Sequence, residues 1–167
     1  LDLEKEKLGE KLLKEFGIKS KRQPNWARWK TLVENILNPK KSVRIAIVGK
    51  YIDIGDYSLA DSYISINHAL THAGASLDTG VEIRWIDSKS FEKDRKSLNQ
   101  LKDYDGVIVP GGFGSSGVEG KISAINYARI NKIPYLGLCY GLQMAVIEFA
   151  RNVCGLKDAH TTEVNPK

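Results

Sequence analysis

Before residue 42, apolar residues recur at the spacing of helices that have one apolar face. A first helix, which Gly17 is expected to end, is predicted by Leu1, Leu8, Leu12 and Phe16. A second helix follows the linker-like segment "SKRQP" and is expected to stop at Pro39; its apolar positions are Trp26, Trp29, Val33 and Ile36. Because each helix is apolar on one face only, both are expected to pack against another part of the protein.

From residue 43 onward, short and almost wholly apolar segments alternate with segments of helical periodicity. The apolar segments predict strands at 43–49, 81–86, 105–110 and 133–138. The periodic segments predict helices at 59–74, 118–131 and 141–152, the first of them closed by Gly74. Such alternation is typical of an α/β fold, a mostly parallel sheet with helices on both faces. We therefore predict linker helices in residues 1–41 and one α/β domain in residues 42–167.

The composition is that of a globular protein, with 42% hydrophobic and 27% charged residues in a chain of 167. The net charge of +5 is not gathered in a basic block with interleaved aromatic residues, so nucleic-acid binding is not expected and a solvated basic face is the simpler interpretation. No segment has the length of a membrane-spanning helix, and no secretory signal is visible. Two cysteines suggest no disulfide framework, so the expected compartment is the reducing cytoplasm. Because the chain begins with leucine, we expect it to be a piece of a longer protein.

Cys139 stands where a predicted strand turns into a predicted helix, between Gly137 and Gly141 in "GLCYGLQ". This is the spacing of a nucleophile elbow with cysteine in place of serine, and the glycines allow a tight turn. The N-terminus of the following helix would stabilise a thiolate and a nearby oxyanion. We interpret Cys139 as a nucleophile; the alternative is a small buried residue, a common role of free cysteine. Cys154 has no such setting and is interpreted as structural.

The loop "PGGFGSSG", residues 110–117, follows the third predicted strand and matches a G-x-G-x-x-G pattern. Dinucleotide binding would also need an acidic residue about 20 positions later, at the end of the next strand, and none stands there. A Walker loop would need Ser or Thr after Gly120-Lys121, where Ile122 stands. Because sites form at the carboxyl ends of parallel strands, we interpret the loop as lying beside Cys139 and offering an N–H group to an oxyanion. A plain strand-to-helix turn is the alternative.

The histidines do not identify a general base. His68 and His72 are four residues apart on a predicted helix, but no third metal ligand is spaced nearby, so a surface or packing role is favoured. His160 lies beyond the last predicted helix, in "DAHTTEV".

Five motifs together resemble the glutamine amidotransferase domain of CTP synthases: "VGKY", "PGGFG", "GVEGKI", "GLCYGLQ" and "TTE". The elbow and "PGGFG" alone indicate class I glutaminases, whereas "DSYISINHALTHAG" and "TTEV" are more specific to CTP synthases. The resemblance runs from about Trp26 to Pro166, and residues 1–41 resemble the end of the synthetase domain with its interdomain linker helices. It implies the flavodoxin-like, three-layer fold of class I glutamine amidotransferases.

The resemblance also implies a ligase activity. Enzymes of this family release ammonia from L-glutamine and pass it through a tunnel to the synthetase domain. There ATP, assisted by magnesium, activates UTP, and ammonia converts it to CTP in pyrimidine biosynthesis. GTP activates the glutaminase step, and no cofactor is expected in the amidotransferase domain itself. The implied partners are L-glutamine, the synthetase domain of the same chain and the other copies of a homotetramer.

By the same resemblance, Cys139 attacks the glutamine side-chain amide and a γ-glutamyl thioester forms. The backbone N–H groups of Gly112 and Tyr140 are expected to form the oxyanion hole, and Glu163 is expected to hold the α-amino group. The expected glutamine-binding residues are Gly112, Tyr140, Gly141, Leu142, Gln143 and Glu163. No metal site is expected.

The sequence departs from the family pattern at three points. The family's catalytic histidine and glutamate, in a His-Pro-Glu motif, and a substrate-binding arginine are expected beyond Lys167, so the 167 residues alone are expected to be inactive. Tyr140 stands where leucine is usual, and Ser116 stands where arginine is common. Two other interpretations stay open. One is a non-catalytic binding or regulatory module, and the other is a relative of protease- and chaperone-like proteins, which place a glutamate after the first strand, where this chain has Lys50.

Overall fold

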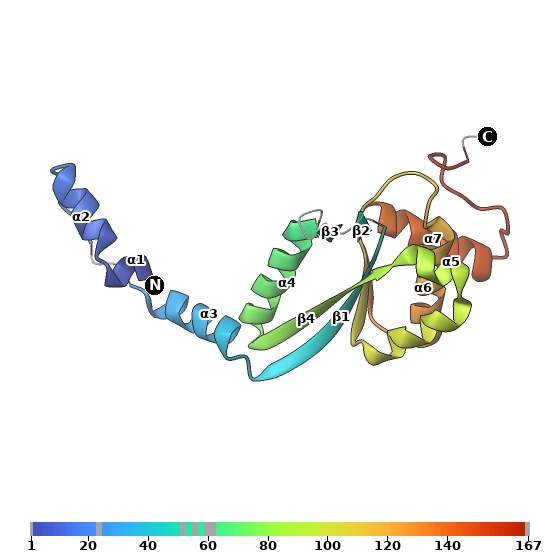
Figure 1. Ribbon diagram of the computed structural model, residues 1–167, viewed down its shortest axis with the longest axis horizontal. Helices are drawn as coiled ribbons and strands as arrows, with labels where there is room; N and C mark the ends of the chain where they lie inside the picture. Colours follow the sequence, from blue (N-terminus) through green and yellow to red (C-terminus); the bar gives the residue numbers. More distant parts are fainter. Residues whose placement is uncertain (1, 23–24, 51–52, 55–56, 59–62, 166–167) are drawn as a thin grey trace.

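The computed structural model of the protein describes residues 2–22, 25–50, 53–54, 57–58 and 63–165. Three helices precede the sheet and extend from one end of the molecule (Figure 1): α1 (Asp2–Lys5), α2 (Leu8–Glu15) and α3 (Ala27–Leu37). The prediction of one helix up to Gly17 is wrong, because Lys7 takes a left-handed backbone with φ 54° and separates α1 from α2. Gly17, with φ 63°, follows the end of α2.

Helix α4 (Ile64–Ser76) packs against α3, and the Asn35 side-chain amide donates a hydrogen bond to the Ala75 carbonyl at 2.8 Å. The prediction that Gly74 closes this helix is wrong, since α4 continues past it. An added Cβ on Gly74 would lie 2.9 Å from the Val81 side chain, so this glycine serves the close approach of helix and strand. Leu59, the predicted start of the helix, lies outside the described residues.

Four parallel strands form the central sheet, in the order β4-β1-β5-β6. Their bounds are β4 (Thr79–Asp87), β1 (Lys41–Gly49), β5 (Gly106–Val109) and β6 (Tyr135–Gly137). The register pairs Ile45 with both Ile83 and Gly106, and pairs Val109 with Gly137. A separate antiparallel pair is formed by β2 (Asp53–Ile54) and β3 (Tyr57–Ser58). The predicted parallel α/β sheet is therefore confirmed.

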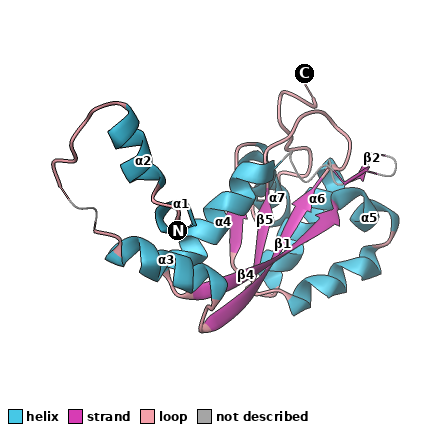
Figure 2. Cartoon of the chain, turned by 60° about the vertical axis from the view of Figure 1, so that its left-hand side comes forward, coloured by secondary structure: helices cyan, strands magenta, loops and turns pink. Residues whose placement is uncertain are grey.

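Helices cover both faces of the sheet (Figures 1 and 2). Helix α4 lies on one face, and α5 (Ser88–Lys93), α6 (Val118–Ile130) and α7 (Tyr140–Asn152) lie on the other. The main core fills the space between the sheet and this second group of helices. Its largest members include Val48, Phe91, Leu101, Val107, Val109, Ile125, Tyr140, Met144 and Ile147.

Residues 88–103, for which the sequence predicts no helix, contain α5 and the 3-10 helix η2 (Arg95–Asp103). An aspartate caps the N-terminus of each of these two elements. Asp87 accepts a hydrogen bond from the Lys89 N–H at 3.0 Å, and Asp94 accepts one from the Lys96 N–H at 2.9 Å. Aspartate caps mark the starts of these elements, and Phe91, Leu98 and Leu101 pack them against the core.

One side of the domain stays apolar and exposed. Strand β6 ends the sheet, and Leu136 on it is 53% exposed. On and beyond the outer face of α7, the exposed apolar side chains are Leu142, Val146, Phe149, Val153 and Leu156. A contiguous apolar face of this kind is typical of an interface. Among the described residues, no helix is long and apolar enough to cross a bilayer.

Candidate active site

The carboxyl ends of β5 and β6 bring the two predicted site segments together. β5 leads into the glycine loop 110–117, and β6 leads through Leu138 to Cys139. The Leu138 N–H donates a hydrogen bond to the Val109 carbonyl at 3.0 Å, which ties the end of one strand to the end of the other. An added Cβ on Gly111 would lie 3.6 Å from the Cβ of Cys139, so the loop lies directly beside the cysteine.

Cys139 occupies a strained turn. Its backbone has φ 52° and ψ −108°, in the half of backbone space that glycine adopts easily and other residues avoid. Holding a cysteine there costs about 1–3 kcal/mol. The residue is exposed and precedes the first turn of α7, so the thiol lies at the N-terminus of that helix. Exposure and strain do not fit the alternative of a small buried cysteine.

The two glycines of the elbow are required by close packing. An added Cβ on Gly137 would lie 2.7 Å from main-chain atoms of Gly141, and one on Gly141 would collide with the Val109 carbonyl. Cys154 is also exposed, but its backbone has an ordinary negative φ. Strain therefore distinguishes the two cysteines, whereas exposure does not.

Three side chains hold the glycine loop. Lys50, after the end of β1, donates a hydrogen bond to the Phe113 carbonyl at 3.0 Å. The Tyr140 hydroxyl donates to the Gly114 carbonyl at 2.9 Å, and the Glu163 carboxylate accepts from the Gly114 N–H at 3.0 Å. Burial, together with the charge of Glu163, raises the pKa of Tyr140, so its hydroxyl keeps the proton that it donates. Neither Lys50 nor the Tyr140 hydroxyl was assigned a role by the sequence.

The two expected oxyanion donors are free to bind. Within the described residues, the N–H groups of Gly112 and Tyr140 have no hydrogen-bond acceptor. The side chain of Tyr140 is buried, but only its backbone is needed at an oxyanion hole. The elbow and the loop therefore bring the Cys139 thiol and these two N–H groups to the same ends of β5 and β6.

A groove of about 540 Å³ lies along the first turns of α7. Its lining includes Leu142, Gln143 and Glu163, three of the expected glutamine-binding residues. Cys139, Gly112, Tyr140 and Gly141 do not line this groove. Gly141 packs closely against Val109 and so shapes the turn that leads into the groove.

The C-terminal segment that carries Glu163 is anchored to α7. The Thr161 hydroxyl donates a hydrogen bond to the Gln143 side-chain carbonyl at 3.1 Å. The Arg151 guanidinium donates to the Ala159 carbonyl at 2.7 Å and pairs with Glu119 at 3.0 Å. These contacts position Glu163, and no motif in the sequence marks Arg151 for this role.

The positions of the three histidines do not identify any of them as the general base. His160 lines the groove, but its Nδ1 accepts a hydrogen bond from the Thr161 N–H at 3.0 Å. His68 and His72 are exposed on α4, with ring centroids 6.3 Å apart. In the part of the chain that the structure describes, no group of three His, Cys, Asp or Glu residues could hold a metal ion.

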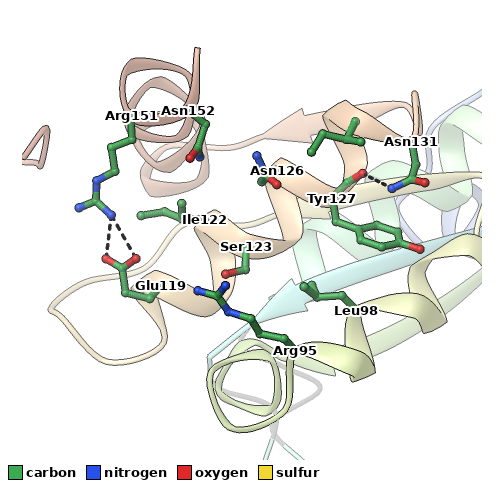
Figure 3. A pocket seen from close by; sticks show the side chains of 11 residues that line it. Arg95, Leu98, Glu119, Ile122, Ser123, Asn126, Tyr127, Asn131, Arg151 and Asn152 are labelled. Atoms are coloured by element: carbon green, nitrogen blue, oxygen red, sulfur yellow. Dashed lines mark hydrogen bonds and ion pairs between the residues drawn. The ribbon is translucent and has the colours of Figure 1, made fainter. Parts of the chain in front are cut away.

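A second groove, of about 470 Å³, runs along α6 between η2 and α7 (Figure 3). Arg95 and Tyr127 lie on its walls, and the ion pair of Arg151 with Glu119 crosses one end. None of the expected site residues lines this groove. The functional candidate is therefore the groove beside the elbow.

The chain is similar to curated proteins named CTP synthase. It is 49% identical to the one from Sulfolobus acidocaldarius over 166 residues, and 52% identical to the one from Carboxydothermus hydrogenoformans over 166 residues. Each match covers 99% of this chain and 30% of the relative. The chain thus spans about a third of the length of these relatives.

The fold is also similar to that of a solved structure. The Trypanosoma brucei CTPS glutaminase domain with bound acivicin matches with a TM-score of 0.67 and 42% identity, over 75% of this chain and 47% of that chain. The family model described as "Glutamine amidotransferase class-I" matches residues 58–166, which include the elbow, the glycine loop and Glu163. The chain therefore belongs to the class I glutamine amidotransferase family.

Proposed function

We propose that the full-length protein is a glutamine-hydrolysing CTP synthase and that Cys139 is the nucleophile of its glutaminase. The observation that carries this proposal is that Cys139 is exposed at a helix N-terminus and has a strained backbone. Strain of this kind persists where it serves a function. The names of the relatives support the substrate and the product.

The reaction follows from the groups beside the thiol. The Cys139 thiolate attacks the side-chain amide carbon of L-glutamine, and the carbonyl oxygen becomes negative. The N–H groups of Gly112 and Tyr140 donate hydrogen bonds to that oxygen. When the C–N bond breaks, the nitrogen takes a proton and leaves as ammonia, and a γ-glutamyl thioester remains. Water then hydrolyses the thioester to glutamate and the free thiol.

The groove beside the elbow is the proposed glutamine site. Leu142 and Gln143 lie on its α7 side, and Glu163 lies opposite with a carboxylate suited to the substrate's α-ammonium group. A histidine and a glutamate of the full-length protein are proposed to supply the general base. In this proposal Gly141 also belongs to the glutamine site, as the resemblance implies, and shapes the turn.

The remaining parts of the reaction are proposed for the full-length protein. Ammonia reaches a synthetase domain that binds ATP, magnesium and UTP, and GTP activates the glutaminase. Residues 1–41 link that domain to the amidotransferase domain of residues 42–167. We propose a cytoplasmic homotetramer.

Two other functions have less support. A purely binding or regulatory module has no use for a strained thiol. A protease- or chaperone-like relative would carry a glutamate after the first strand, whereas Lys50 stands there and bonds the glycine loop.

A glutamine analogue tests the nucleophile directly. We expect 6-diazo-5-oxo-norleucine to add one label to the full-length protein, at Cys139, as read by peptide mass spectrometry. The label is expected to persist in Cys154→Ala, which removes the other exposed cysteine of the chain, and to vanish in Cys139→Ala. Labelling that survives in Cys139→Ala would refute the assignment.

The anchor of the C-terminal segment gives a second prediction. Arg151→Gln removes the charged donor to Ala159, so Glu163 is held less firmly. The KM for glutamine is expected to rise about 5–10-fold, equivalent to about 1 kcal/mol of binding. The matched control Glu119→Gln removes the ion pair but keeps the bond to Ala159, and its KM is expected to change less than twofold. Equal KM values for Arg151→Gln and the wild type would contradict the anchoring role.

A further inference from the structure

Lys121, in the first turn of α6, has a completely buried side chain that is 0% exposed. Its Nζ has no hydrogen-bond partner among the described residues. Burying an ammonium group without a partner destabilises a fold. Packing alone therefore gives no reason for a lysine at this position.

The buried ammonium lies against Gly112 and against the ring of Tyr140, the two residues whose N–H groups are the expected oxyanion donors. Nζ lies 3.2 Å from the position that a Cβ on Gly112 would occupy. It also lies over the ring of Tyr140, 5.1 Å from the centroid, in a cation–π contact. One cation thus packs against both residues whose N–H groups are the proposed donors.

The elements packed near Lys121 carry several charged or titratable groups. Lys50, from the end of β1, brings a second positive charge to the same loop, and Glu163, from the C-terminal segment, brings one negative charge. On α5, Glu92 accepts a hydrogen bond from the Gly120 N–H at 3.2 Å. Tyr140 and Cys139 belong to the elbow. Burial, and to a smaller extent Lys50, lower the pKa of Lys121 to about 8.

We propose that Lys121 is a positioning residue of the glutaminase, whose buried ammonium fixes the backbone of Gly112 and the ring of Tyr140 and adds positive potential where the oxyanion forms. The inference rests on the proposed function of Cys139. Negative charge on the oxygen develops only in the transition state, so a fixed cation nearby lowers the barrier more than it strengthens glutamine binding. The cation is therefore expected to raise kcat rather than to lower KM.

The decisive variant is Lys121→Met in the full-length protein, because methionine keeps most of the length of the side chain and removes the ammonium group with its charge. We expect kcat for glutamine hydrolysis to fall about 10–100-fold, below the effect of losing a direct oxyanion donor. KM is expected to stay within twofold. CTP formation from added ammonium chloride, which bypasses Cys139, is expected to be unchanged. The matched control is Lys93→Met, which removes the same charge from an exposed position on α5.

Two further measurements separate this role from a structural one. Removing an unpaired buried charge is expected to leave the melting temperature equal or higher, so lost activity would not reflect lost folding. A lysine with a lowered pKa is charged below that pKa and neutral above it, so the wild-type kcat is expected to fall as the pH rises through about 8. In Lys121→Met this alkaline decline is expected to be absent.

Three outcomes would overturn the inference: a kcat within twofold of wild type, a loss confined to KM, or an alkaline decline equal to that of the wild type. The pH dependence of kcat in the wild-type protein also tests, without any substitution, whether the charge of Lys121 is needed. A wild-type protein without glutaminase activity would instead overturn the proposed function, and this inference with it.

Discussion

Replacing Cys139 by alanine in the full-length protein is expected to lower glutamine-dependent CTP formation by at least about 10⁴-fold. The same variant is expected to make CTP from added ammonium chloride at the wild-type rate. The two results together would place Cys139 in ammonia release and leave the synthetase reaction intact.

The size of the effect follows from the chemistry of the amide. A carboxamide is a poor electrophile, and covalent attack by a thiolate divides its hydrolysis into two easier steps. The proposed oxyanion donors Gly112 and Tyr140 would remain, but no nucleophile would be present to form the oxyanion. Alanine keeps the Cβ atom of the strained residue and removes only the sulfur, so the elbow is expected to keep its shape.

Glutamate release, measured by a coupled dehydrogenase assay, checks this prediction. The matched control is Cys154→Ala, which removes an exposed cysteine with relaxed backbone and is expected to keep wild-type activity. Glutamate release by Cys139→Ala at a substantial fraction of the wild-type rate would contradict the assignment of the nucleophile.

Glu148→Ala is expected to be the most destabilising of the proposed substitutions. Glu148 is 1% exposed on α7 and accepts hydrogen bonds at 2.7–3.2 Å from the side chains of Asn126, Arg129 and Asn152. Removing one partner of a buried ion pair costs about 3 kcal/mol at the low end of the usual range, which applies because Arg129 is partly exposed. The melting temperature of this domain is expected to fall by about 6–12 °C.

The stabilisation by Glu148 depends on pH. Burial acts to raise the pKa of its carboxyl, but the hydrogen bonds from Arg129, Asn126 and Asn152 outweigh burial and lower it from the ordinary 4.5. A lowered pKa in the folded state means that the carboxylate stabilises the fold fully above about 4.5 and loses this effect as the pH falls through the lower value. The difference in melting temperature between wild type and Glu148→Ala is therefore expected to shrink below that pH.

Calorimetry of the full-length variants gives the measurement. Glu119→Ala is the matched control, because it breaks another ion pair between α6 and α7 that is mostly exposed on the Glu119 side. Exposed pairs contribute about 0–1 kcal/mol, so this control is expected to lose little. Equal melting temperatures for Glu148→Ala and Glu119→Ala would show that burial does not decide the strength of the pair.

The sheet and the elbow could be predicted because their local sequence has no good alternative structure. Strand β5 and the second half of β1 are buried, so their residues are apolar and stand out from the helices. The turn at Cys139 needs glycine on both sides, since Gly137 and Gly141 meet backbone atoms directly. Because this packing requirement falls on residues two positions before and after Cys139, it leaves a glycine–cysteine–glycine spacing that can be recognised in the sequence.

The features that the sequence did not reveal depend on contacts between distant segments. A lysine in a helix is ordinarily expected to face solvent, and Lys121 is buried only because the glycine loop and Tyr140 fold over the first turn of α6. Arg151 reaches the Ala159 carbonyl for the same kind of reason. Helix α5 and η2 were missed because their apolar residues are few, and Phe91, Leu98 and Leu101 do not form a run long enough to stand out from the polar residues around them.

The backbone of Cys139 also bears on the history of the chain. At φ 52° and ψ −108°, the backbone would be less strained with glycine than with cysteine. A cysteine codon becomes a glycine codon by a single base change, so a lineage with no need for the thiol would drift toward glycine and gain stability by doing so. Under the proposed function, the cysteine at this turn is therefore expected to reflect selection for chemistry over selection for stability.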